Sequence, residues 1–138
     1  MKPSLALACL LLLAAPACRT KVQRREASVE APPPALAQAT AAWEVVARGR
    51  VVGVVVEFDA VDGDRRFFSV RNPAQQELGM VDAHGRWWRY RPHEEEAEWL
   101  GTGTVIQGAG AILGLETEPE AYEVGLETLT RESEVPKR

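Results

Sequence analysis

Apolar residues along this chain of 138 residues change their spacing several times, and each change predicts a different kind of structure. The densest pattern spans 47–58, where valines dominate and apolar side chains fall on both faces. β-Branched residues at this density favour a strand over a helix. We therefore expect a central or strongly curved strand at 47–58, with Gly49 and Gly53 as candidate bend or bulge sites.

Three shorter strands are predicted after it, at 66–71, 77–82 and 86–91. Their apolar residues occur in short runs bounded by turn-forming residues, which is typical of strands. Strands that follow one another at such short intervals pair antiparallel and form a meander. The predicted breaks are Asp62-Gly63, Asn72-Pro73, Ala83-His84-Gly85 and Pro92.

The spacing becomes helical after Thr104. Thr104 and Gln107 have the spacing of a capping box, and Gly114 stands where a helix stop is expected. Apolar residues between them repeat every three or four positions, whereas Gly108 and Gly110 each cost about 1 kcal/mol relative to alanine in a helix. We expect a short helix packed on the sheet, and a glycine-rich strand is the alternative.

Alternating apolar residues predict a last strand at 121–129, and residues 131–138 form a polar tail. Together these elements predict a single domain over 41–130 with no internal repeat. The expected fold class is α+β: a small curved antiparallel β-meander, similar to a half-barrel, with one short helix.

The first 17 residues have a different character. Lys2 gives a positive start, residues 5–15 are an uncharged apolar run, and small residues follow at Ala15-Pro16-Ala17. These are the three regions of a secretory signal peptide. The run is shorter than the roughly 20 residues that span a bilayer. The polar segment behind Pro16 also gives a buried N-terminal helix nothing to pack against. We therefore expect 1–17 to be removed and the protein to be exported.

Cys18 follows the small residues directly, and Ala15-Pro16-Ala17-Cys18 resembles the end of a bacterial lipoprotein precursor. Ala15 stands where that family usually has leucine. The resemblance implies that Cys18 becomes the lipid-carrying N-terminus. It also implies an anchor in the cell envelope, by default in the outer membrane facing the periplasm or the exterior, because no aspartate follows Cys18. The alternatives are a freely secreted protein with a chance cysteine and an intermolecular disulfide. Cys9 would be lost with the leader, so no internal disulfide can form.

Residues 18–40 are expected to be a tether, because they contain many charged residues, alanines and prolines but almost no large apolar residues. Pro32-Pro33-Pro34 should stiffen its middle into an extended rod. A small basic cluster near the anchor could contact anionic lipid head groups, or it could simply be solvated. Its members are Arg19, Lys21, Arg24 and Arg25.

The charge of the chain narrows the range of partners. The formal net charge is −4 and the pI is near 5.3, and the segment 41–138 contains 11 Lys and Arg against 18 Asp and Glu. An acidic, exported protein is not suited to binding nucleic acid. The expected partners are the membrane, through the N-terminal lipid, and an envelope protein or cell-wall glycan.

The predicted strand 86–91 has the densest group of candidate contact residues. Aromatic rings interleaved with arginines can bind sugars by stacking and anions by bidentate contacts. The structural alternative is that one face of the strand is core and that its arginines pair with the acidic run at 94–98, and the small size of the sheet favours this alternative. Alternation should place Arg86, Trp88 and Tyr90 on one face and Trp87, Arg89 and Arg91 on the other.

Patterns for catalysis and metal binding are weaker. The two histidines, His84 and His93, are in no zinc-binding motif, and Ser69 is the only serine between 41 and 130. No nucleophile elbow or phosphate-binding loop occurs. We therefore expect a protein that is not an enzyme and holds no metal or cofactor. The alternative is a small hydrolase or metal-dependent enzyme that uses His84, His93, Asp82 and Glu94.

Overall fold

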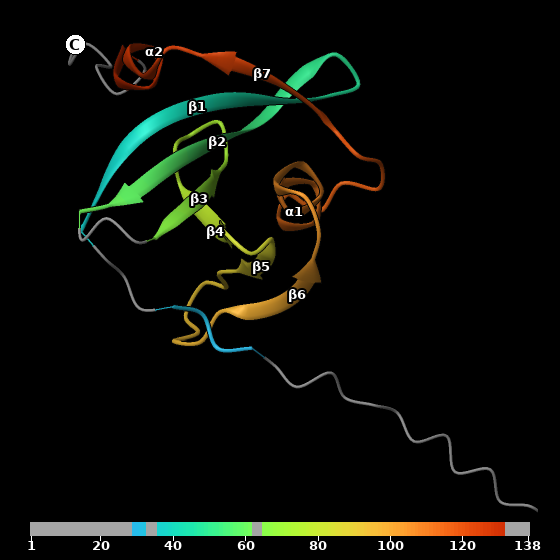
Figure 1. Cartoon of the computed structure of the whole chain (residues 1–138). Coiled ribbons are helices and arrows are strands. Elements are labelled where there is room, and N and C mark those ends of the chain that lie inside the picture. Colours follow the sequence, from blue (N-terminus) through green and yellow to red (C-terminus); the bar gives the residue numbers. More distant parts are fainter. Residues whose placement is uncertain (1–28, 33–35, 62–64, 132–138) are drawn as a thin grey trace, which may run out of the picture.

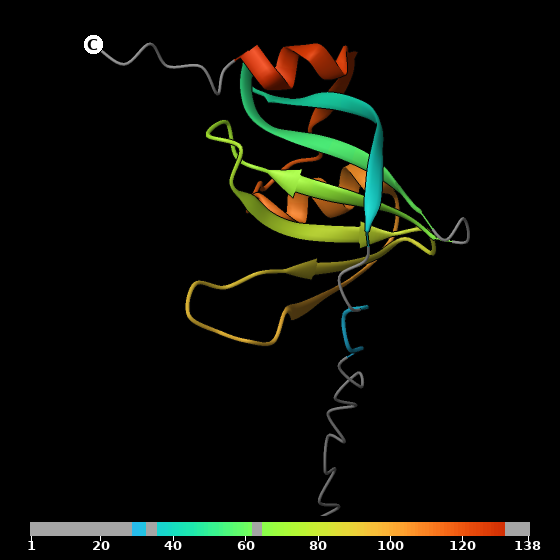
Figure 2. The same ribbon diagram turned by 90° about the vertical axis from the view of Figure 1, so that its left-hand side faces the viewer.

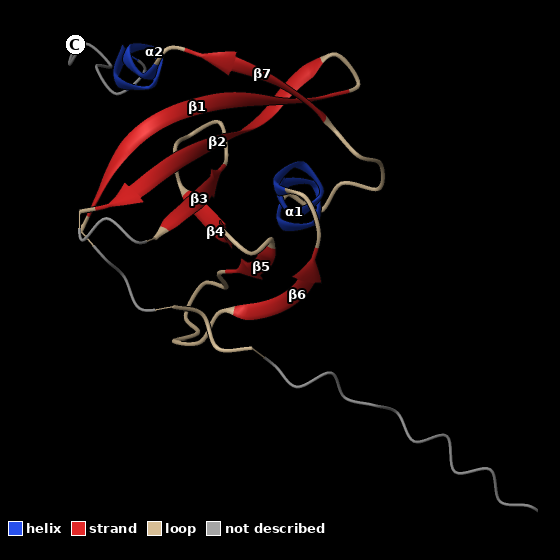
Figure 3. Ribbon diagram, viewed as in Figure 1, coloured by secondary structure: helices blue, strands red, loops and turns tan. Residues whose placement is uncertain are grey.

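Figure 1 shows a computed structural model, which describes residues 29–32, 36–61 and 65–131. These residues form a mostly-β structure, a seven-stranded antiparallel sheet with two short helices (Figure 3). The elements in chain order are β1 (Ala37–Ala47), β2 (Arg50–Ala60), β3 (Arg66–Arg71), β4 (Glu77–Asp82), β5 (Arg86–Arg89), β6 (Glu98–Thr102), α1 (Val105–Ile112), β7 (Glu120–Val124) and α2 (Leu126–Arg131).

The strands lie in the order β6-β5-β4-β3-β2-β1-β7, and each neighbouring pair is antiparallel. The predicted meander is confirmed for β2 to β5, and β1 and β6 extend it, because each of the first six strands pairs with the next one along the chain. Strand β7 departs from that order. The chain passes through α1 and crosses to the opposite edge, where β7 pairs with residues 42–46 of β1 (Figure 1).

The expected half-barrel is wrong, because the sheet is neither closed nor strongly curled. Its edge strands β6 and β7 do not pair with each other. Different helices cover parts of the two faces, so the sheet can bury apolar residues without closing on itself. The two helices contain only 8 and 6 residues, and the fold is therefore mostly β rather than α+β.

The single strand expected at 47–58 is in fact the end of one strand and most of another. Strands β1 and β2 form a hairpin around Arg48 and Gly49, whose φ angles of 52° and 72° are typical of a type I′ turn. Most of β1 was missed because its first half is rich in alanine, a poor strand former. It begins at Ala37, inside the segment expected to be tether. The Asp62-Gly63 turn lies outside the described residues.

Two further predictions fail after β4. Strand β5 ends at Arg89 rather than residue 91, and β6 was not predicted because it begins within the acidic run. The strand expected at 121–129 is divided at Gly125 into β7 and α2. Leu126 and Leu129 are three residues apart, a helical spacing, and they pack against Val54 and Val56.

The predicted helix is confirmed as α1, and the glycine-rich strand is wrong. The Gln107 amide donates to the Thr104 hydroxyl and the Thr104 amide donates to Gln107 Oε1, both at 3.1 Å, which completes the capping box. Gly114 has a φ of 71°, and its amide donates to the carbonyl of Ala111. The Leu115 amide donates to the carbonyl of Gly110, so the helix ends in a Schellman motif.

The two faces of the sheet are buried by different elements. Helix α1 covers one face, where Ala109 and Ile112 pack against valines from β1 to β4. Helix α2 covers the opposite face only over β1 and β2. Figure 2 views this second face, with α1 behind the sheet and α2 at one end. Its remaining part, over the end of β2 and over β3 to β5, is the surface that we call the open face.

Substituting Gly108 tests how closely α1 approaches the sheet. A Cβ at this position would lie 2.5 Å from Trp87 Cδ1 and 2.8 Å from Val81 Cγ2. We expect Gly108→Ala to lower the free energy of unfolding by about 1–2 kcal/mol, since overpacking outweighs the gain in helix propensity. Chemical denaturation measures this change. Gly110→Ala is the control, because its nearest atom is Pro119 Cδ at 3.1 Å. An equal effect of both substitutions would contradict the prediction.

Candidate functional site

Side chains along β5 alternate between the two faces of the sheet as the sequence predicts. Trp87 and Arg89 face α1, where Trp87 packs against the helix core and Arg89 reaches a helix carbonyl. Arg86 and Tyr90 line a groove on the open face, and the Arg86 guanidinium lies over the ring of Trp88. The candidate contact residues are therefore divided between the core and the open face.

Trp88 is fully buried, although it points toward the open face. Its ring meets Trp99 edge to face at a centroid distance of 5.6 Å, and the Arg86 guanidinium carbon lies 5.5 Å from its centroid. Its indole Nε1 donates a hydrogen bond of 2.7 Å to the carbonyl of Val29. Trp88 thus supports the open face from beneath and contacts the N-terminal segment through its N–H group.

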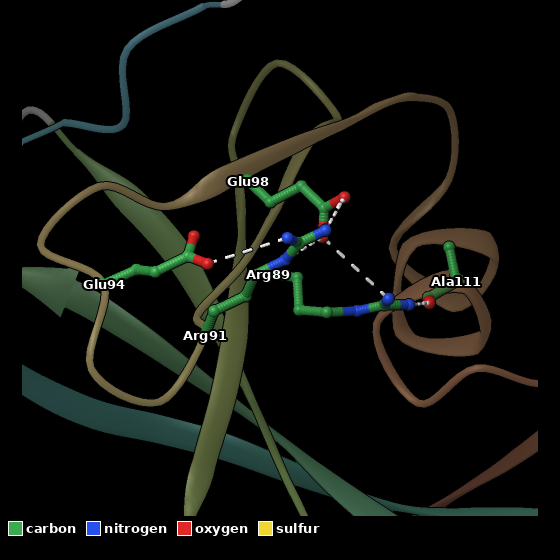
Figure 4. A network of polar contacts seen from close by, with 5 residues as sticks. All are labelled: Arg89, Arg91, Glu94, Glu98 and Ala111. Atoms are coloured by element: carbon green, nitrogen blue, oxygen red, sulfur yellow. Dashed lines mark hydrogen bonds and ion pairs between the residues drawn. The ribbon is translucent and has the colours of Figure 1, made fainter.

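The other face of β5 fixes α1 (Figure 4). The Arg89 guanidinium donates to the carbonyl of Ala111 in the last turn of the helix. A cation at this end of a helix is favourable, since the unpaired carbonyls carry partial negative charge. Arg89 also lies 4.0 Å from Glu98. Its contacts are therefore structural.

Arg91 belongs to an exposed ion-pair network at the edge of the same sheet (Figure 4). It makes a bidentate contact with Glu98, at 2.6 and 3.0 Å, and lies 3.7 Å from Glu94. The hydrogen bond to Glu98, together with the charges of Glu98 and Glu94, raises the pKa of Arg91 above its usual value. Pairing of the arginines with the acidic run was the structural alternative in the sequence, and Arg91 shows this pairing.

Arg86 is held by Asp82 in the β4–β5 turn. The Asp82 carboxylate is 7% exposed and accepts hydrogen bonds from the backbone amides of His84 and Arg86 at 3.0 and 2.9 Å. It also accepts a bond of 2.6 Å from Arg86 Nε. Every one of these bonds is local, so Asp82 orders the turn and fixes Arg86 at the border of the open face.

The open face contains a groove of about 780 Å³. The rings of Phe58 and Phe67 stack within it, with centroids 5.3 Å apart. The Arg71 guanidinium lies 5.6 Å from the Phe58 centroid, and Arg71 Nε donates to the Ser69 hydroxyl at 3.2 Å. Arg71 makes no ion pair with any described carboxylate. The groove therefore combines apolar rings with a cation that is available to a ligand.

Most of these groove residues were not predicted from the sequence. They come from β2, β3 and β4, and strand pairing places Phe58 opposite Phe67, and Met80 opposite both Ser69 and Trp88. The signal was present in the alternation of each strand, because Phe58, Phe67 and Met80 occupy positions that share a face. Alternation within a strand does not show which residues of neighbouring strands lie opposite each other, so the groove could not be assembled from it.

Tyr90 borders the groove and is 36% exposed. Partial burial, with a smaller contribution from the negative charge of Glu77, raises the pKa of its hydroxyl to about 12. Both effects disfavour the phenolate. Tyr90 therefore presents a neutral hydroxyl and the edge of an aromatic ring to the groove at physiological pH.

The residues of the enzyme alternative are only partly brought together. Asp82, His84 and Glu94 line the groove, but His93 does not. Asp82 is paired with Arg86, and Glu94 with Arg91. Among the described residues, no three His, Cys, Asp or Glu side chains are grouped so that they could hold a metal ion.

A second hollow of about 830 Å³ adjoins the groove near the start of α1. It shares Arg66, Asp82 and His84 with the groove. Arg66 pairs with Glu57 and Asp59, and the capping box satisfies the amide at the helix start. The groove therefore remains the better candidate for a binding site.

Cys18, the proposed anchor, lies outside the described residues. In the part of the chain that the structure describes, no helix is long and apolar enough to cross a membrane. No protein-family model, curated protein or solved structure matches this chain.

Titration of Tyr90 tests the environment of the groove. The folded protein should keep the Tyr90 proton up to a pH of about 12, whereas the unfolded chain loses it near 10. The contribution of Tyr90 to stability is therefore fully present below pH 10 and is lost as the pH rises toward 12. Phenolate absorbance at 295 nm should show a step near pH 12 that Tyr90→Phe removes. In denaturant this step should move to near pH 10. If Tyr90→Phe instead removes a step near pH 10 in the folded protein, Tyr90 is solvated.

Proposed function

We propose that this protein is a lipid-anchored lipoprotein of a bacterial cell envelope and that it acts as a binding or assembly module without catalytic activity. The leader at 1–17 and the resemblance at Ala15-Pro16-Ala17-Cys18 support export and acylation of Cys18. More than one acyl chain is needed for stable anchoring, and the lipoprotein family supplies them. The default location is the outer membrane, with the domain facing the periplasm or the exterior.

The groove on the open face is the observation on which the binding role rests. The helices leave this part of the sheet uncovered, and aromatic rings stay partly exposed there beside arginines. Apolar concave surfaces with a few polar groups are the usual form of ligand sites. Of the expected binding residues at 86–91, Arg86 and Tyr90 line this groove. The proposed contact surface is therefore a face built from several strands and not a single strand.

The groove is suited to a cell-wall glycan or to a segment of an envelope protein. Stacked rings such as Phe58 and Phe67 can pack against a sugar or an apolar side chain. Arg71 can offer a bidentate contact to an acidic group. Neither ligand requires a metal or a cofactor.

The anchor is tested by the mass and location of the protein in a bacterial host. The full precursor should yield a membrane-bound product that begins at Cys18 and is heavier by a diacylglyceryl group and an acyl chain. Cys18→Ser should leave the protein out of the membrane fraction and without the added mass. A parent protein that is found in the soluble fraction at its unmodified mass would contradict the anchor and favour free secretion.

The groove is tested separately by photo-crosslinking in the same cells. A photoreactive phenylalanine analogue at position 90 should give reproducible adducts with an envelope component, since Tyr90 borders the groove. The same analogue at position 122 is the matched control, because Tyr122 is 54% exposed and lies on β7 outside the groove. Identical adducts at both positions, or none at position 90, would contradict the binding role of the groove.

A further inference from the structure

One wall of the groove is formed by an N-terminal segment of the chain. Residues 29–32 lie against the open face, outside any helix or strand (Figure 1, blue). The Val29 carbonyl accepts the hydrogen bond from Trp88 Nε1, and Ala31 and Pro32 line the groove. These contacts join positions 59 residues apart in the chain.

The Trp88 contact has the chemistry of backbone recognition. A buried indole N–H without an acceptor costs free energy, so an oxygen in line with the Trp88 N–H group stabilises the fold. Neighbouring strands offer their carbonyls to one another within the sheet, and the acceptor here comes from a segment that belongs to no strand. Any extended peptide could supply the same carbonyl.

The surroundings favour a peptide that contains proline. Pro32 shares the groove with Phe58, Phe67 and Tyr90, and the sequence continues with two more prolines. Aromatic grooves bind proline-rich segments well, because such segments are already extended and lose little entropy on binding. An indole N–H that meets a backbone carbonyl then fixes the position of the segment.

Carboxylates at the groove favour basic residues in the peptide. Glu94, Glu95 and Glu96 line the groove and are exposed. In the sequence, the residues before Val29 include four basic side chains within seven positions, Arg19, Lys21, Arg24 and Arg25. A segment that carries basic residues near its prolines would therefore complement these carboxylates.

We propose that the part of the open face beneath residues 29–32 is a peptide-binding site for an extended, proline-containing segment that carries basic residues. Residues 29–32 occupy this site in cis, and a partner segment of the same chemistry binds by displacing them. This inference rests on the proposed binding role of the groove and names its ligand class. While it is docked, the tether also holds the domain close to its anchor.

Competition between the tether and an added peptide tests the proposal. The probe is a fluorescent synthetic peptide with the sequence of residues 19–36, titrated into the purified full chain. The comparison is a variant that lacks residues 19–32, because a replacement sequence would keep the backbone carbonyl that Trp88 Nε1 meets. A segment tethered in cis has an effective concentration on the order of millimolar, so its removal should tighten peptide binding by at least about tenfold. Fluorescence anisotropy measures both affinities.

Two controls distinguish binding at this site from non-specific binding of the peptide. In the variant background, Trp88→Phe keeps a ring but removes the N–H donor, and it should weaken peptide binding by roughly five- to tenfold. Trp43→Phe is the matched control, because Trp43 packs against the core on the α1 face. If Trp88→Phe fails to fold, a peptide with alanine in place of its three prolines tests the specificity of binding without altering the protein.

Equal affinity of the parent and the variant for the peptide would overturn the proposal, as would equal binding of the alanine peptide. If position 90 crosslinks to an envelope component in cells and the variant does not bind the peptide, the groove takes another ligand, such as a glycan. The peptide proposal then fails and the proposed function stands. If crosslinking at position 90 also fails, both fail.

Discussion

Side chains along β5 alternate between the two faces of the sheet, so this one short strand contributes to two different surfaces. Trp87 and Arg89 fix α1 on one face, while Arg86 and Trp88 support the groove on the other. A slip of one residue in the pairing with β4 would exchange these two sets and remove the contact of Arg89 with the helix carbonyl. The irregularity between Trp87 and Trp88 opposite β6 adjusts the twist without such an exchange. The register of β5 therefore determines both which side chains pack against α1 and which side chains line the groove.

The groove exists because the helices cover the sheet unequally. Helix α1 lies on the centre of its face, whereas α2 is only six residues long and contacts β1. The rings left exposed beside it are partly shielded by cations, since Arg71 lies over Phe58. Arg86 similarly lies over Trp88, whose indole N–H donates to the N-terminal segment. Such shielding lets an aromatic surface remain partly exposed and still be available to a ligand.

Local patterns predicted the local elements and little beyond them. The box at Thr104 and the stop at Gly114 identified α1, and the alternation of β5 identified its two faces, because each depends on neighbouring residues only. The alanine-rich half of β1 has no such pattern and is a strand because β2 and β7 flank it. Phe58 and Phe67 meet through strand pairing, and the Val29 contact joins distant positions. The groove depends on strand register and on tertiary packing, and neither can be derived from local sequence patterns.

The pairing of β7 with β1 has a consequence for how the protein folds. The first six strands can assemble one hairpin after another as the chain emerges, since each pairs with its immediate predecessor. The free edge of β1 must wait for the last part of the domain, because residue 42 pairs with residue 124. Contacts between such distant positions form slowly. During that interval, an unprotected strand edge is open to other chains. The pairing of β7 with β1 is therefore the folding step at which misassembly with other chains is most favoured.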